Sequence, residues 1–466
     1  MAVGDEEGWV HLFDTDPKAA FTPHLRFRCH HNAIMDLQFS SDDKYLATAS
    51  GDQSAQIIDM ITQQCIAVLA NHTSSVKQVC FQPEDDNIIA TSSRDGTVRL
   101  WDLRCSGNSN IAITACGTAP YASSIRTITG AHADILPATP PSNSRLGYDL
   151  LSALIEYAQV LTSTSERKIE SARRGDISIT SLSFLGPGRE HLLLTASDAS
   201  SCVKLWDIRG RYSRKGPSIP VSTTRHPESH ERHRHFAINS LTLNTDFSRL
   251  YALSKDNTVY AYSTSHLILG HAPELAVSEC SRQKHMATNK EGLGPLYGFR
   301  HQNFHAGSFY VKSALRKSRG DQTELLAVGS TDGCPVLFPT DERFLRSSRC
   351  SDNTGCLPSW SPPSGRPGLR SSGFSSARSS SSFSSFIKDT IPIFEIGTPL
   401  IRGHDTEVTS VTWAQNGSLV SIADDYRVRC WREGPMAADL RAGGEEQGRR
   451  WGCGWAAVDE EWDELE

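Results

Sequence analysis

The sequence predicts an all-β fold in which seven short antiparallel sheets stack radially. The first observation behind this prediction is a spacing. An acidic turn residue is followed by a bulky apolar residue six positions later in most repeats, and eight positions later in one. The second observation is an apolar strand before the turn that ends in small residues, as in "YLATAS" (45–50) and "LLLTAS" (192–197). The repeats are counted by their bulky residue, at Phe13, Ile58, Trp101, Trp206, Tyr262, Phe338 and Trp431.

The stretch "SRDGTVRLWD" (93–102) illustrates how one repeat is built. An acidic tight turn leads into alternating residues, which predicts a hairpin turn followed by a strand. Inner strands such as "IMDLQF" and "VTSVTW" precede the hairpins, several of them after a histidine, at His31, His72, His235 or His404. One such sheet cannot bury both of its faces alone, so radial stacking is expected.

This pattern resembles the WD-repeat family, and seven repeats then imply a seven-bladed β-propeller. In that family a histidine, the turn aspartate and a strand serine or threonine hydrogen-bond toward the tryptophan of the same blade. For the repeat that ends at Trp101, the resemblance implies His72, Ser92 and Asp95. Further structural residues implied in the same way are Asp52, Asp256, Asp332, Asp425 and Trp431. These histidines and aspartates are therefore not interpreted as catalytic dyads.

The first repeat is incomplete, because residues 1–13 align without gaps on residues 326–338 and the inner strands before them are absent. Two interpretations are open. Residues after Trp431 close the ring by strand exchange, or the sequence lacks its true start. The tail, 435–466, is rich in glycine and charge and is poor strand material, which favours the second interpretation.

Long spacings between repeats predict insertions that project from the ring. The predicted organisation is a propeller over 1–339 with an insertion at about 106–175, a disordered Ser-rich insertion over 340–398, the last blade over 399–434 and the tail. In the first insertion, "GYDLLSALIEYAQVL" has helical spacing, which predicts a helix that caps the propeller or binds a partner. The Ser-rich tract is interpreted as disordered filler, with phosphorylation as the alternative.

Composition argues against several classes of function. A formal net charge of -6 and a pI near 6.3 give no general attraction to nucleic acid or membranes, so neither is expected as a direct partner. The twelve cysteines include no Cys-x-x-Cys pair, which indicates reduced thiols without a disulfide framework. The start of the chain does not resemble a signal peptide and no apolar run is long enough to span a membrane, so a soluble intracellular protein is expected.

No catalytic, metal or cofactor site is expected either. The histidines of "RHPESHERHRHF" (225–236) fit no common closed metal site and are interpreted as a solvated loop; they are His226, His230, His233 and His235. The sequence contains no phosphate-binding loop, nucleophile elbow or paired-carboxylate arrangement. A propeller enzyme is therefore disfavoured.

Two nearly identical stretches, "VRLWDLRC" and "VKLWDIRG", carry an arginine two residues after the Trp-Asp pair, at Arg104 and Arg209. Blade construction explains the pairs Trp101–Asp102 and Trp206–Asp207 but not the arginines. Both arginines are expected on one rim of the ring in consecutive blades. A local ion pair is the simpler interpretation, whereas two matched arginines favour a docking surface, since arginine is enriched among interface hot spots.

The motif Trp-Asp-x-Arg in adjacent blades resembles the substrate receptors of cullin-4 RING ubiquitin ligases, which dock through it onto the damage-specific DNA-binding adaptor protein. Stretches such as "SGDQSAQIID" (50–59), "HQNFHAGSFYVKSAL" (301–315) and "GHDTEVTSVTW" (403–413) are similar to the denticleless-type receptors. The resemblance implies a nuclear, non-catalytic subunit without a cofactor. Its substrates would be replication-licensing and cell-cycle proteins, recognised when bound to the sliding clamp PCNA.

Clamp-coupled recognition is a weaker expectation than adaptor docking, because the family's C-terminal clamp-binding motif is not found before Glu466. Substrate contacts are expected on the face opposite the two arginines. Candidates chosen by position in the repeat are Lys77, Arg94, Lys255, Tyr310, Lys312 and Arg427. The alternative function is a generic propeller scaffold for a chromatin or RNA-processing complex, in which the two arginines merely pair on the rim.

Overall fold

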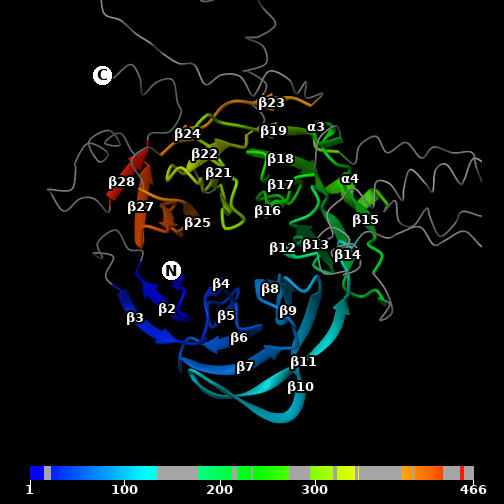
Figure 1. Cartoon of the computed structure of the whole chain (residues 1–466), viewed down its shortest axis with the longest axis vertical. Coiled ribbons are helices and arrows are strands. Elements are labelled where there is room, and N and C mark those ends of the chain that lie inside the picture. Colours follow the sequence, from blue (N-terminus) through cyan, green and yellow to red (C-terminus); the bar gives the residue numbers. More distant parts are fainter. Residues whose placement is uncertain are drawn as a thin grey trace, which may run out of the picture.

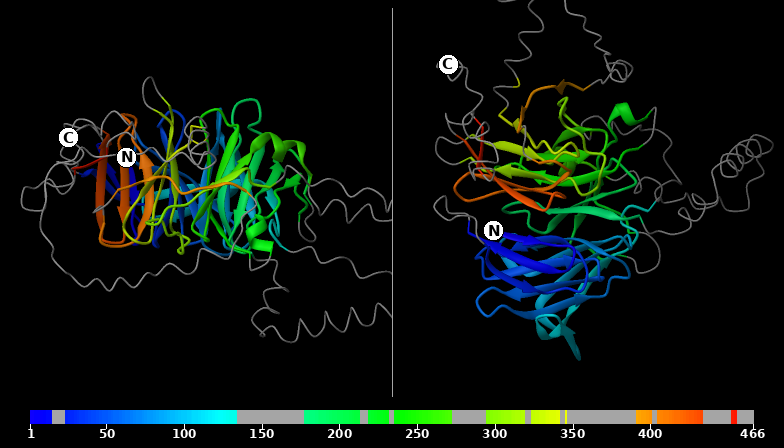
Figure 2. Two further views of the ribbon diagram at one scale, coloured as in Figure 1. Left: turned by 90° about the horizontal axis from the view of Figure 1, so that it is seen from above. Right: turned by 60° about the vertical axis from the view of Figure 1, so that its left-hand side comes forward.

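A computed structural model describes residues 1–14, 23–133, 177–212, 218–231, 235–271, 294–318, 323–341, 345, 391–400, 404–433 and 452–455. These residues form a ring of twisted sheets around a central axis (Figure 1), and the ring is a disc when seen edge-on (Figure 2, left). Each sheet is one propeller blade, except that two blades share an eight-stranded sheet. The predicted all-β, seven-bladed architecture is confirmed.

Blades one to three hold the first eleven strands. Blade one has three strands and blades two and three have four each, joined at their outer edges by one parallel bridge between Tyr121 and Val68. The strands are β1 (Ala2–Gly4), β2 (Trp9–Phe13), β3 (Pro23–Arg28), β4 (Ile34–Phe39), β5 (Tyr45–Ser50), β6 (Ser54–Asp59), β7 (Gln64–Ala70), β8 (Val76–Gln82), β9 (Asp85–Ser93), β10 (Val98–Thr114) and β11 (Gly117–Ile128).

Blades four and five follow, with two short helices beside them. Blade five gains a fifth strand, β23, which runs parallel to β19. The elements are β12 (Ile179–Phe184), β13 (Leu192–Ser197), β14 (Lys204–Asp207), β15 (Ser222–Thr223), α3 (Glu228–Glu231), β16 (Ile238–Leu243), β17 (Arg249–Ser254), β18 (Thr258–Ser263), α4 (Thr264–Leu269), β19 (Tyr297–Phe299) and β23 (Ile393–Phe394).

Blades six and seven each have four strands. The outer strand of blade six, β24, is antiparallel to its neighbour, and that of blade seven, β28, is parallel. The strands are β20 (Ser313–Arg316), β21 (Leu325–Val328), β22 (Val336–Pro339), β24 (Thr398–Pro399), β25 (Val408–Trp413), β26 (Leu419–Ala423), β27 (Arg427–Glu433) and β28 (Gly452–Trp455).

Three of the expected boundaries change. The hairpin of β10 and β11 occupies the start of the insertion predicted at 106–175, because this segment pairs as the outer part of blade three. Residues 391–398, expected within the disordered insertion, pair as β23 and the start of β24, so the strands of the last blade begin at Val408. The tail supplies β28, contrary to the expectation of poor strand material. The predicted helix and the Ser-rich tract lie outside the described residues.

Polar side chains on the inner strands hold successive blades together. The Asp36 carboxylate accepts the Val79 backbone N–H at 3.1 Å, and the Gln78 side-chain carbonyl accepts the Leu182 N–H at 2.6 Å. The Ser181 hydroxyl accepts the Leu241 N–H at 3.1 Å, which continues the chain from blade four to blade five. Each bond satisfies an inner-edge N–H that would otherwise lack a strand partner. The order of the blades around the axis is fixed in this way.

The bulky repeat residues lie in the core that joins neighbouring blades. Trp101, Trp206 and Trp431 are fully buried, as are Ile58 and Phe338, and Tyr262 is nearly so. Phe13, in the three-stranded first blade, is half-buried. Burying an aromatic side chain of this size contributes roughly 2–3 kcal/mol, which explains why the repeat keeps a large apolar residue at this position.

Candidate functional site

The histidines and turn aspartates of the repeats form buried networks inside the blades. In blade three, His72 Nδ1 lies 3.0 Å from Asp95, and His72 Nε2 lies 2.8 Å from the Thr91 hydroxyl. The Trp101 indole N–H donates to that same hydroxyl at 2.8 Å. The prediction that Ser92 provides this hydroxyl is wrong. Alternation along β9 places Thr91 on the same face as Ile89, the cross-strand partner of Trp101, and Ser92 on the opposite face.

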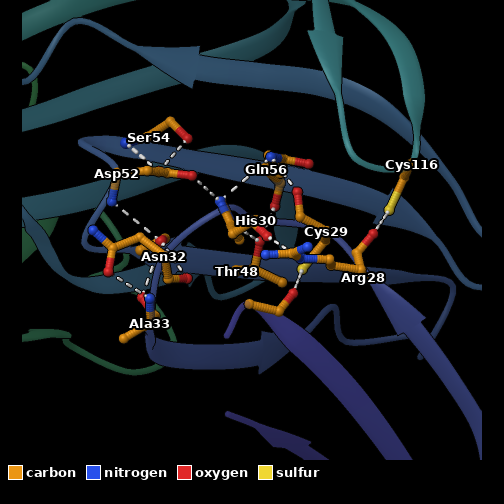
Figure 3. A network of polar contacts seen from close by, with 12 residues as sticks. Arg28, Cys29, His30, Asn32, Ala33, Thr48, Asp52, Ser54, Gln56 and Cys116 are labelled. Carbon is orange, nitrogen blue, oxygen red and sulfur yellow. Dashed lines mark hydrogen bonds and ion pairs between the residues drawn. The ribbon is translucent and has the colours of Figure 1, made fainter. Parts of the chain in front are cut away.

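Blade two has the same network around a different histidine from the one expected (Figure 3). His30 lies 2.8 Å from Asp52 and 2.7 Å from the Thr48 hydroxyl, while Gln56 donates to the Cys29 carbonyl at 2.8 Å. His31 is exposed, so its assignment is wrong. The buried histidine precedes the inner strand by four residues, as His72 does in blade three.

Blades five and seven continue the pattern. In blade five, His230 from α3 lies 2.7 Å from Asp256, so the assignment of His235 to this position is wrong. The ring of His235 instead stacks on that of His226, with the ring centroids 4.0 Å apart. In blade seven, His404 lies 3.1 Å from Asp425 and 2.8 Å from the Ser421 hydroxyl. Trp431 donates to the same hydroxyl at 2.8 Å. These groups are committed to the fold, as the interpretation against catalytic dyads expects.

Blades four and six depart from this arrangement. In blade four, His132 contacts the Thr195 hydroxyl at 2.9 Å, and Trp206 donates to it at 2.9 Å. The repeat spacing does not reveal His132, because this residue lies before the long insertion, far from its inner strand at Ile179. In blade six, His305 and Asp332 pair at 2.7 Å, but both side chains are about half exposed.

Arg104 and Arg209 occupy equivalent positions on neighbouring blades. Each donates from Nε and Nη2 to the two carboxylate oxygens of the aspartate two residues earlier: 2.8 and 3.0 Å for Asp102, and 3.0 and 2.9 Å for Asp207. Arg104 also lies 3.2 Å from Asp85. Within the described part of the chain, neither Nη1 atom has a hydrogen-bond partner. Each guanidinium is thus fixed against its aspartate, and the two arginine side chains are 56% and 66% exposed.

The two arginines lie on the same face of the ring. Asp102 pairs with Ile88 and Asp207 pairs with Leu192, which places both motifs at the end of the blade where the second strand begins. Blades three and four also touch beside the motifs, because Arg126 donates to the Gly210 carbonyl and Gln82 donates to the Glu190 carbonyl at 3.1 Å. The surface formed by Arg104, Arg209 and their aspartates is called the arginine rim below.

Electrostatics keep both pairs of the arginine rim ionised. The hydrogen bond from Arg104 lowers the pKa of Asp102, and the one from Arg209 lowers the pKa of Asp207. The same bonds raise the pKa of each arginine. Exposed pairs like these add little to stability. Their main consequence is orientation, since a guanidinium fork fixed by its neighbour presents a planar surface to a partner.

Most of the residues expected to contact substrate lie at the opposite face, where the second strands end. Lys77 and Lys255 lie near one aromatic ring, with Nζ 4.4 Å and 6.0 Å from the Phe309 centroid, and Tyr310 lies next to that ring and is 46% exposed. Arg94 interacts electrostatically with Lys77. The structure therefore brings Lys77, Lys255 and Tyr310 together around Phe309, a residue that the repeat pattern does not reveal, and Arg94 acts electrostatically on Lys77.

The other two candidates are bound differently. Lys312 donates from Nζ to the Asn239 carbonyl at 3.0 Å, and burial lowers its pKa to about 8, with Asp36 acting in the opposite direction. Arg427 pairs with Asp405 at 3.1 Å in blade seven. Both side chains therefore bind to neighbouring residues of the propeller.

The described residues contain no cluster of three or more histidine, cysteine or acidic side chains arranged to hold a metal ion. The cysteines in the described part of the chain are free thiols. None of the helices within the described ranges has the length and apolar character needed to cross a membrane. His226 lies near Cys202 and Ser201, 2.7 Å from the Ser201 hydroxyl, and His233 lies outside the described residues.

Comparison with known proteins agrees with the fold. The family model "WD domain, G-beta repeat" matches residues 21–59, 63–102 and 396–432. The protein named Cell division cycle protein cdt2 from Schizosaccharomyces pombe is 26% identical over 457 residues, 95% of this chain and 68% of that protein. Denticleless protein homolog A from Xenopus laevis is 25% identical, over 98% of this chain and 48% of its own length.

The human relative gives the same result at slightly lower identity. Denticleless protein homolog from Homo sapiens is 23% identical over 93% of this chain and 44% of its own length. The chain therefore spans about two thirds of the fission-yeast relative and about half the length of these vertebrate relatives. The similarity extends along nearly the whole chain, from the first blade to the last.

Proposed function

We propose that this chain, a WD-repeat β-propeller protein similar over most of its length to denticleless-type proteins, is a non-catalytic substrate receptor of a cullin-4 RING ubiquitin ligase. The observation that carries the proposal is the arginine rim: two Trp-Asp-x-Arg motifs on adjacent blades, on one face, with both guanidinium groups held in the same conformation. In this proposal the rim docks onto the damage-specific DNA-binding adaptor protein.

Physical chemistry supports this role for the rim. Each arginine is already held by two charge-assisted hydrogen bonds, so less side-chain entropy is lost when a partner binds. The planar fork suits carboxylates and backbone carbonyls, which are the acceptors a protein partner presents. The histidines and aspartates that would otherwise suggest chemistry are committed to blade networks, which supports a binding role over a catalytic one.

The finer parts of the proposal concern substrates and place of action. The receptor holds replication-licensing and cell-cycle proteins, recognised when bound to PCNA, beside the ubiquitin-charged enzyme in the nucleus. Holding a substrate there raises the effective concentration of its lysines, which requires no catalytic group on the propeller. The opposite face of the ring receives these proteins in this account.

Affinity capture from cells tests the proposal. The unmodified protein should recover the adaptor and the cullin, and a variant with Arg104→Ala plus Arg209→Ala should lose both. Lys44→Ala plus Lys317→Ala is the matched control, since it removes two exposed charges at the same end of other blades. Equal capture by all three proteins would contradict docking through the arginine rim.

A second candidate function is a generic scaffold for a nuclear complex. The observation that favours it is that each rim arginine already pairs with its local aspartate, as a purely structural arginine would. The two functions differ in their cellular consequence. Under the scaffold function, replication-licensing factors are still degraded on schedule during S phase after the gene is deleted, whereas under the receptor function they persist.

A further inference from the structure

The face opposite the arginine rim carries two adjacent aromatic side chains over the central axis. Phe309 and Tyr310 lie in the loop before β20 of blade six, with ring centroids 3.8 Å apart. Phe309 reaches Lys77 on β8 of blade three, which lies across the ring, and approaches Lys255 of blade five. Side chains from blades three, five and six therefore meet on this face of the ring. We call Lys77, Arg94, Lys255, Phe309 and Tyr310 the aromatic-cation cluster.

Hydrogen bonds fix the loop that carries the two aromatic residues. The buried Asn239 side-chain amide donates to the Ala306 carbonyl at 3.2 Å and to the Ser308 carbonyl at 2.6 Å. Asn257 accepts the Ala306 N–H at 2.7 Å. The loop is thus clamped by blade five along the residues just before Phe309. A preorganised loop loses little backbone entropy when a ligand binds.

The cluster has an excess of positive charge. Three cations, Lys77, Arg94 and Lys255, interact electrostatically with one carboxylate, Asp198. None of these cations lies within 4.0 Å of Asp198 among the ion pairs of the described residues. Burial lowers the pKa of Lys77, with Arg94 acting in the same direction, so an added negative charge would stabilise the site. Tyr310 adds an exposed ring beside these charges.

We propose that the aromatic-cation cluster binds an acidic peptide segment, with carboxylates on Lys77, Arg94 and Lys255 and an apolar side chain against Tyr310. This inference rests on the proposed receptor function, because it takes this face as the one that receives protein segments. Charge complementarity selects the occupant: Lys77 and Lys255 beside one ring, with Arg94 acting electrostatically on Lys77, match clustered carboxylates. A nucleic acid fits less well, since the cations form no continuous track and Asp198 lies among them.

Fluorescence anisotropy with the full chain tests this proposal. The probe is a short labelled peptide with a central phenylalanine flanked by glutamates, and the comparison peptide carries lysines in place of the glutamates. The glutamate peptide should bind and the lysine peptide should not. Lys77→Gln plus Lys255→Gln should weaken binding at least about tenfold, and Tyr310→Ala at least about threefold. Lys44→Gln, on an exposed cation paired with Asp42 at the other end of blade two, is the control and should bind as the unmodified protein does.

Three results would overturn the proposal: equal binding of both peptides, unchanged binding by the double variant, or displacement of the glutamate peptide by a single-stranded oligothymidine of similar length at lower concentration. Thermal melting of each variant confirms that the fold is retained. Binding of purified adaptor by the unmodified protein is measured in parallel. Peptide binding without adaptor binding would reject only the receptor function, and adaptor binding without peptide binding would reject only this proposal.

Discussion

Arg104 and Asp102 form a two-point ion pair within one motif, with Nε 2.8 Å from one carboxylate oxygen and Nη2 3.0 Å from the other. The Asp102 carboxylate also accepts the Arg104 backbone N–H at 2.9 Å. Arg209 and Asp207 repeat this arrangement on the next blade. The aspartate of each motif therefore positions its arginine, in addition to its place at the end of the strand.

Removing the charge of both aspartates should weaken adaptor binding without removing either arginine. Asp102→Asn plus Asp207→Asn leaves Arg209 with a weaker amide acceptor, and leaves Arg104 with a weaker amide acceptor and the Asp85 carboxylate, so binding has to order the side chains. We expect affinity for purified adaptor to fall about threefold to tenfold. Asp59→Asn in blade two is the control. Asp59 accepts the backbone N–H of Ile61, and Ile61 occupies the position at which blades three and four have arginine. An equal effect of the control would contradict the positioning role.

The rim arginines should not be needed for folding. Blade two forms the same turn with Ile61, which is 79% exposed, at the arginine position. Arg104→Ile plus Arg209→Ile should therefore leave the free energy of unfolding nearly unchanged. The melting temperature by differential scanning fluorimetry checks this, and a loss of many degrees would show that the arginines hold blades three and four together.

Thr91 should be far more important for stability than its neighbour Ser92. Thr91→Val removes the hydroxyl that the Trp101 indole and His72 share, leaving buried polar groups without a partner. We expect a loss of about 2 kcal/mol in the free energy of unfolding. Ser92→Ala is the matched control: its buried hydroxyl has no hydrogen-bond partner in the described structure, so its loss should be nearly neutral. Urea denaturation measures the free energy of unfolding of both variants. Comparable losses in the two variants would contradict the hydrogen-bond network around Thr91.

Acid should destabilise the protein through its buried histidines. Burial holds the pKa of His132 well below 6.5, and the charge of Lys204 acts in the same direction; burial also lowers the pKa of His404. An unfolded histidine titrates at about 6.5, so the unfolded chain binds more protons below that pH. Stability is therefore full above about pH 6.5 and falls as the pH drops toward the folded pKa values.

A His132→Gln variant isolates the contribution of His132 to this effect. It should be less stable than the unmodified protein near neutral pH, yet lose less of its melting temperature between about pH 7.5 and pH 5.5. If the melting temperature of the variant falls as much as that of the unmodified protein over that range, the acid sensitivity arises from groups other than His132.

The repeat pattern was sufficient to predict the ring, because the bulky residue recurs in every blade and the turn aspartate pairs with a buried histidine in blades two, three, five and seven. Assigning Thr91 needed one further step, since strand alternation from the partner of Trp101 reaches Thr91 and not Ser92. The four-residue spacing from His72 to its strand would likewise have selected His30 over His31. His132 could not be found this way, because the insertion hides its distance from Ile179.

The outer strands were least predictable. β23, β24 and β28 are two to four residues long and pair after long intervening segments, so neither periodicity nor length identifies them. The arginine rim was predictable in its placement, because the motif fixes the strand end. Its two-point pairing was not, since an arginine two residues after an aspartate can adopt many rotamers. Phe309 was missed because its partners come from blades three and five.

The most direct measurement is the affinity of purified adaptor for the purified protein, by biolayer interferometry, with and without Arg104→Ala plus Arg209→Ala. The receptor account predicts that the unmodified protein binds and that the double variant binds at least about thirtyfold more weakly at an unchanged melting temperature. The account would be contradicted if the two proteins bound the adaptor equally, or if the unmodified protein did not bind it.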